Sequence, residues 1–172
     1  MNKDTQNTQP QEWTEEGYEQ FLASHPDYPE PEPIERLELV MKRSNALAII
    51  SGEKRVEFRA YTQHYVNRLY DKATENYVER HKDEPEILFW VDTMRRVDTI
   101  RVHDYNRTWT LDVECTFQDL VAPTDEGVAM LHEEYDCHEM DEVHRKLKRE
   151  GVKQYPLYFY FELGEILKRE NI

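Results

Sequence analysis

The chain has 172 residues, a formal net charge of −14 and only two cysteines. This length fits one domain with an appendage and is enough to bury a hydrophobic core. No apolar run approaches the roughly 18 residues of a membrane-spanning helix, and we expect no secretory signal after Met1. From the missing apolar run we expect no membrane partner. Two cysteines are too few for a disulfide framework, so we expect a reducing, cytoplasmic setting.

The acidic residues are unevenly distributed along the chain. They outnumber the basic residues in 1–36 and in 120–172, whereas 37–119 is nearly balanced. A basic patch in the middle can therefore bind phosphate while the remote acidity supports solubility. The chain's pI of about 4.9 is nevertheless far below that of strong non-specific nucleic-acid binders, which carry a large positive charge. Any nucleic-acid binding should be local and selective, or weak.

Residues 1–33 are expected to form an acidic, partly disordered arm ahead of a domain that spans 34–172. Residues 1–12 are polar, which is typical of disorder. Thr14 can cap a short helix that docks on the main body. Residues 25–33 hold four of the eight prolines, which predicts an extended linker because alternate prolines interrupt any hydrogen-bond ladder.

The first half of the expected domain alternates between strands and helices. Apolar alternation predicts a strand over 37–41, and Ser44 is expected to be the N-cap of a short helix over 45–51. A charged strand over 54–61 then leads into an amphipathic helix over 62–82. Residues 87–91 are apolar and fit either a helix or a strand.

The second half contains the clearest two-residue periodicity. From Trp109 to Phe117 every second residue is apolar, which predicts that both of these aromatic residues face the core. The class is therefore α+β, with a mixed sheet or a small barrel. The expected elements are strands over 97–104 and 109–117, a helix over 125–149 broken near 136–138, a strand over 157–163 and a terminal turn over 164–169.

The octapeptide GEKRVEFR at residues 52–59 carries the strongest functional pattern. Strand alternation places Glu57 and Arg59 on one face, and Lys54 at the preceding turn can reach that face. Two cations and a carboxylate beside the flexible Gly52 suit a polar, anionic ligand. The spacing alone also fits a solvated strand face with weak surface ion pairs.

Because this octapeptide joins a short helix to a strand, the chain resembles the ASCH domain of the PUA-like superfamily. Members carry a Gly-x-Lys-x-x-Glu-x-Arg signature at this junction, here Gly52, Lys54, Glu57 and Arg59. The resemblance extends over roughly residues 37–163 by the order of elements. It implies a PUA-like small mixed β-barrel with flanking helices, and we expect no cofactor. It also implies a cleft, lined by the signature, that binds RNA, a nucleotide or a modified nucleoside.

Some small members of this family resemble amidohydrolases of acylated cytidine, and others cleave RNA. The amidohydrolase-like members use the signature lysine, a threonine where Glu57 stands here, and an acid from a later helix. The resemblance implies Lys54, Glu57 and either Glu134 or Asp136 as the catalytic candidates. The missing hydroxyl argues against this activity. A lysine close to two carboxylates should stay protonated, which suits anion binding more than base catalysis.

Two further groups of residues are chemically suggestive. Arg101 and His103 share a strand face among interleaved bases and aromatics, as a stacking and phosphate-binding surface would, or as an ordinary polar sheet face. Four metal-capable residues follow no standard zinc spacing, so we expect no metal site. These four are His132, Cys137, His138 and His144.

Three hypotheses follow. The first is a binder of RNA, a nucleotide or a modified nucleoside, with Lys54 and Arg59 on phosphate or carbonyl oxygens and Glu57 orienting them. The second is a hydrolase that uses Lys54 and an acid from the later helix. The third is a protein-interaction module that binds a partner through the acidic arm and the Pro-rich linker.

Overall fold

The computed structural model describes residues 11–172 as two compact units. The larger unit comprises Glu32–Tyr70 and Met94–Ile172, and the smaller unit comprises 11–31 with Asp71–Thr93. Residues 11–31 of the expected N-terminal arm therefore belong to the same compact unit as the later segment Asp71–Thr93. Residues 1–10, for which we expected disorder, lie outside the described part of the chain.

The larger unit is built on one five-stranded sheet with the strand order β1-β3-β4-β5-β2. β1 and β3 pair in parallel, and every other neighbouring pair is antiparallel. The long β4–β5 pairing places β2 at the far edge from β1. The strands are β1 (Ile34–Val40), β2 (Val56–Ala60), β3 (Val97–His103), β4 (Thr110–Val121) and β5 (Tyr158–Glu170).

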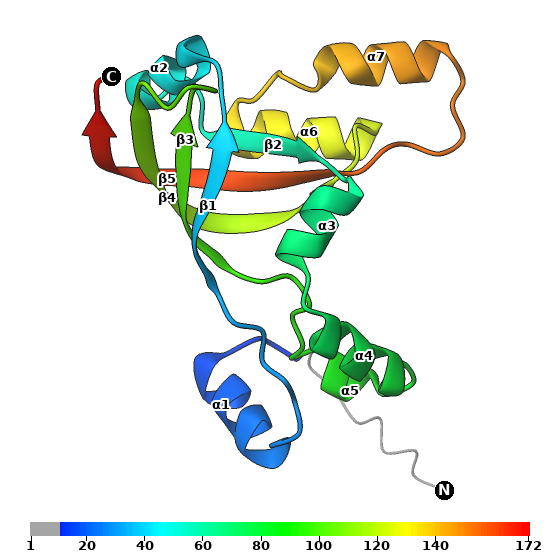
Figure 1. Cartoon of the computed structure of the whole chain (residues 1–172). Coiled ribbons are helices and arrows are strands. Elements are labelled where there is room, and N and C mark those ends of the chain that lie inside the picture. The colour runs from blue at the N-terminus through cyan, green and yellow to red at the C-terminus, as the bar shows by residue number, and fades with distance from the viewer. Residues whose placement is uncertain (1–10) are drawn as a thin grey trace, which may run out of the picture. The chain divides into compact units, whose positions relative to one another are not determined.

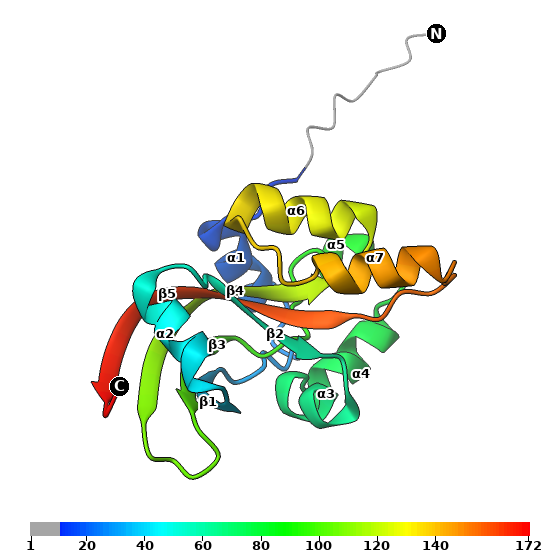
Figure 2. The ribbon, with the colours of Figure 1, turned by 90° about the horizontal axis from the view of Figure 1, so that it is seen from above.

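The sheet curls into a half-barrel, as Figure 1 and the view from above in Figure 2 show. Register shifts between β4 and β5 at Asp112, Val113, Cys115 and Phe117 interrupt the ladder, and such irregularities increase the local twist of a sheet. The expected α+β class with a small barrel-like sheet is therefore confirmed at this level.

Four helices accompany this sheet: α2 (Arg43–Ser51), α3 (Gln63–Leu69), α6 (Asp125–Tyr135) and α7 (Asp141–Arg149). Helices α6 and α7 lie side by side in both views. The break between them falls where the sequence predicted it, and Asp136 ends α6 in the left-handed conformation at φ 48°.

Two hydrophobic clusters hold the larger unit together. One joins the strands, with Leu37, Ile100 and Phe159 fully buried. The other lies between α6 and the β2 side of the sheet, and includes Val56 and Leu131. Burial of such side chains stabilises a fold by roughly 1.5–3 kcal/mol each. These clusters therefore stabilise the sheet and helices that hold the octapeptide in place.

The smaller unit contains α1 (Glu15–Ser24), α4 (Lys72–Arg80) and α5 (Pro85–Leu88). Thr14 caps α1 as predicted, since its hydroxyl accepts a hydrogen bond from the Gly17 N–H at 3.0 Å. An aromatic core of Phe21, Tyr28 and Tyr77 brings α1 and its following loop against α4.

Three sequence predictions are wrong in detail. The single helix expected over 62–82 is divided, because Tyr70 is extended and Asp71 caps the new helix α4 through the Thr74 N–H at 3.0 Å. The expected terminal turn is strand, since β5 continues to Glu170. Phe117 is 49% exposed rather than buried, because the register shifts in β4 break its alternation.

No helix among residues 11–172 combines the length and apolar character needed to cross a membrane.

Candidate functional site

Backbone geometry sets the position of the octapeptide. Gly52 ends α2 in the left-handed region at φ 85°, a conformation that glycine adopts without steric cost. The Lys54 N–H donates to the Ala48 carbonyl at 3.0 Å, which folds the turn back on α2. β2 then pairs with β5, so that Glu57 lies opposite Phe161. The predicted helix–turn–strand context of the signature is present.

The three charged signature residues meet as predicted. Lys54 Nζ lies 3.3 Å from Glu57 Oε2, and Arg59 Nη2 lies 3.3 Å from Glu57 Oε1. The Lys54 and Glu57 side chains are only 7% and 10% exposed, so this group is not a solvated strand face. Arg59 Nη2 also donates to the Val40 carbonyl at 3.0 Å, which ties β2 to the end of β1.

A fourth residue, Glu139, completes the group. Lys54 Nζ donates to Glu139 Oε1 at 2.6 Å. Glu139 lies in the connection between α6 and α7, and its side chain is 47% exposed. We refer to Lys54, Glu57, Arg59 and Glu139 as the charged cluster. Its outer partner faces solvent, whereas its inner carboxylate is buried.

The acids expected opposite Lys54 lie elsewhere. Glu134 is exposed on α6. Asp136 ends that helix, and its Oδ1 lies 3.1 Å from His138 Nε2. The acid that contacts Lys54 is Glu139, which the sequence did not single out. Glu139 sits in the non-helical connection, where helical periodicity carries no information on direction.

Burial dominates the electrostatics of Glu57. Loss of solvation raises the pKa of this carboxyl, and the charges of Lys54 and Arg59 act in the opposite direction. Within the described residues, Glu57 Oε2 accepts no well-directed hydrogen bond and Arg59 Nε donates none. Lys54 Nζ nevertheless lies 3.3 Å from Glu57 Oε2. The charged cluster therefore contains two buried polar atoms whose hydrogen-bonding capacity is not met by its own side chains.

Arg101 and His103, the other expected ligand-binding residues, have partners of their own. The Arg101 guanidinium donates to both oxygens of Asp112 at 2.6 and 2.7 Å, and this holds the pKa of Asp112 below its usual range. His103 is buried, with Nδ1 2.7 Å from the Asp104 carbonyl. These contacts favour an ordinary polar sheet face over a phosphate-binding surface at Arg101 and His103.

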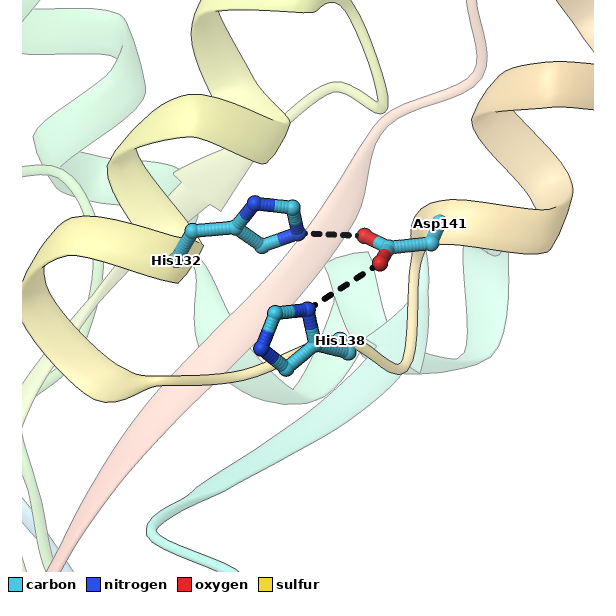
Figure 3. A group of neighbouring side chains, drawn as sticks. All are labelled: His132, His138 and Asp141. Carbon is cyan, nitrogen blue, oxygen red and sulfur yellow. Dashed lines mark hydrogen bonds and ion pairs between the residues drawn. The ribbon is translucent and has the colours of Figure 1, made fainter.

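The four metal-capable residues separate into different surroundings. His132 and His138 come together around Asp141, a residue that the sequence reading did not include (Figure 3). His144 instead contacts Asp125 at 2.7 Å. Cys137 is half-buried, and burial raises the pKa of its thiol.

Searches of family models, curated proteins and solved structures find no match for this chain. The resemblance to the ASCH domain therefore rests on the signature residues and on the order of elements.

Proposed function

We propose that the chain is an ASCH-like, PUA-type domain that binds RNA, a nucleotide or a modified nucleoside at the charged cluster. The observation that carries this proposal is the burial of Lys54 and Glu57 at the junction of α2 and β2, closed on the outside by the half-exposed Glu139. Buried ion pairs contribute little net stability compared with well-packed apolar residues, which favours a binding role for this one.

Glu139 occupies the place of the ligand's anionic group. Its carboxylate is the most exposed member of the cluster and can move into solvent at small cost. Two cations and one carboxylate then remain, which gives the open site a net positive charge. A phosphate or a polarised carbonyl oxygen would accept from Lys54 Nζ in place of Glu139 Oε1.

Glu57 serves as the internal anchor in this proposal. Its two oxygens lie 3.3 Å from Lys54 Nζ and from Arg59 Nη2, so it holds both cations on one side of β2. Removal of the ligand leaves the cations paired with Glu57, and the site does not collapse. This arrangement is a preorganised one, which lowers the cost of ordering side chains on binding.

Binding is tested by titrating the full chain with a fluorescein-labelled short RNA and, by calorimetry, with cytidine monophosphate and cytidine. We expect Lys54→Met and Arg59→Met each to weaken binding by about 10-fold or more, because each removes a charge-assisted hydrogen bond worth roughly 1.5–3 kcal/mol. The matched controls are Lys148→Met and Arg107→Met, whose side chains are exposed and paired with Asp125 and Glu38. Equal affinity in all variants, with circular dichroism unchanged, would overturn the proposal.

A hydrolase is the second candidate, and the 2.6 Å contact between Lys54 and Glu139 favours it. A lysine beside a solvent-facing acid matches two of the three elements in the amidohydrolase-like members, while Glu57 stands in place of their hydroxyl. Release of cytidine from N-acetylcytidine, followed by chromatography, tests this candidate. Turnover lost in both Lys54→Met and Glu139→Gln would support it, and turnover that persists in both variants would mark a contaminant.

A further inference from the structure

A second group of polar residues lies at the junction of α6 and α7. His132 is in the last turn of α6, His138 is in the connection, and Asp141 is the first residue of α7. Figure 3 shows both imidazole rings turned toward the Asp141 carboxylate. The three residues thus converge from three consecutive parts of the chain, and we refer to them as the histidine–aspartate group.

The distances within the group are short. His132 Nε2 lies 2.5 Å from Asp141 Oδ1, and His138 Nδ1 lies 3.1 Å from Asp141 Oδ2. One ligand-capable atom from each residue lies within 4.8 Å of the other two. Ligands of a tetrahedral zinc ion, at roughly 2.0–2.1 Å from the metal, lie about 3.4 Å apart. Movements of an ångström or so therefore convert this group into a coordination sphere.

The outer contacts also suit coordination. His138 Nε2 lies 3.1 Å from Asp136 Oδ1, so a carboxylate orients the ring from behind while Nδ1 faces the centre of the group. Carboxylate–histidine contacts of this kind fix the tautomer and orientation of metal-bound imidazoles. The side chains of His132 and His138 are 39% and 59% exposed, which leaves an entry path and room for a solvent ligand.

We propose that His132, His138 and Asp141 bind one divalent transition-metal ion of the zinc class. Two imidazole nitrogens and one carboxylate oxygen form a donor set that such ions prefer, and a solvent molecule completes four-coordination. The ion takes the place of the hydrogen bonds that the two imidazole rings make with the Asp141 carboxylate. This proposal does not depend on the proposed function of the charged cluster.

A bound ion would also restrict the connection between α6 and α7, which carries a residue of the charged cluster. The bound ion cross-links the end of α6 to the start of α7, and the connection between them carries Glu139. Glu139 is the residue that contacts Lys54. A ligand that binds only the folded chain raises the melting temperature, so we expect Zn²⁺ to raise Tm in the wild-type chain and not in His138→Gln.

The test is a titration of the untagged, chelator-treated full chain with Zn²⁺ in competition with a chromogenic chelator. We expect one ion per chain, and an affinity about 10-fold lower or more in His138→Gln and in Asp141→Asn, since even outer contacts cost roughly 10–100-fold when removed. His144→Gln and Cys137→Ser are the controls and should bind as the wild type does, because they lie outside the group.

Cobalt(II) gives a second readout. The wild-type chain should show d–d absorption bands without the strong charge-transfer absorption of a thiolate ligand, and His138→Gln should lose those bands. Because His138 is largely exposed, this variant is expected to keep the wild-type circular dichroism spectrum. Absence of Zn²⁺ binding by the wild-type chain, or equal loss in His144→Gln, would mean that the group is only a hydrogen-bonded clasp between α6 and α7.

Discussion

Glu57 is a carboxylate that the fold buries between two cations. Its position follows from strand alternation, which sends Val56 into the cluster beneath α6 and Glu57 to the opposite face. Burial removes solvation from the charged form, and Lys54 and Arg59 restore only part of it. The pKa of Glu57 therefore shifts in the direction opposite to the pKa values of Asp112 and Glu162, which hydrogen bonds lower.

The direction can be tested with Glu57→Gln. The folded-state pKa of Glu57 is raised above its unfolded value of about 4.3, so the folded state binds more protons between these two pH values. The wild-type chain then loses stability relative to the variant as pH rises through that window. Urea unfolding at a series of pH values measures this difference. A stability difference that stays constant, or that moves the other way, would contradict the burial account.

The sequence identified part of this site for physical reasons. Lys54, Glu57 and Arg59 are close in the chain, and the period of a strand determines which of them share a face. Glu139 and Asp141 were missed because they lie far along the chain in and beside a helix break, where no periodicity applies. A bonding partner for a buried lysine is set by tertiary packing, which a single sequence does not reveal.

At the scale of elements, α6 is the helix whose position sets where the connection to α7 begins. Its N-terminus is capped by Thr124, whose hydroxyl accepts from the Gly127 N–H at 3.1 Å. A Cβ on Gly127 would lie 1.9 Å from the Ala122 carbonyl oxygen, so the chain enters this helix through a tight approach that requires glycine. Capping and close packing together fix the start of α6.

Thr124→Ala should lower the free energy of unfolding by about 1 kcal/mol, because it removes the side-chain acceptor of an N-cap. Thr62→Ala is a matched control: Thr62 is also an N-cap residue, but its side chain makes no capping hydrogen bond. Urea denaturation of both variants measures the contrast. Equal losses in the two variants would show that the Thr124 cap contributes nothing specific.

Elements were predictable where local signals decided them. The cap at Thr14 and the break after Tyr135 both follow from short-range chemistry. The end of β5 was not predictable in this way, because Gly164 reads locally as a turn residue. In the structure a Cβ at Gly164 would approach Thr116 Cγ2 to 2.7 Å, so this glycine marks a close strand contact.

At the scale of the whole molecule, the net charge of −14 limits how the chain can hold an anion. Binding must come from a few fixed cations, since the general field repels phosphate. For single-stranded RNA held by Lys54 and Arg59 alone, the plot of log K against log salt should have a slope of about −1.4. Anisotropy titrations over a range of salt concentrations measure it. A slope several times steeper would indicate an extended basic surface instead.

The central claim is that Glu139 holds the place of an anionic ligand on Lys54. Titration of wild type, Glu139→Gln and Lys54→Met with the same nucleotide tests it directly. We expect Glu139→Gln to bind more tightly by up to about fivefold, because a half-exposed ion pair that competes with the ligand is worth roughly 0.2–1 kcal/mol. Lys54→Met should bind at least about 10-fold more weakly. Affinities that move in the same direction in both variants, or in neither, would contradict the claim.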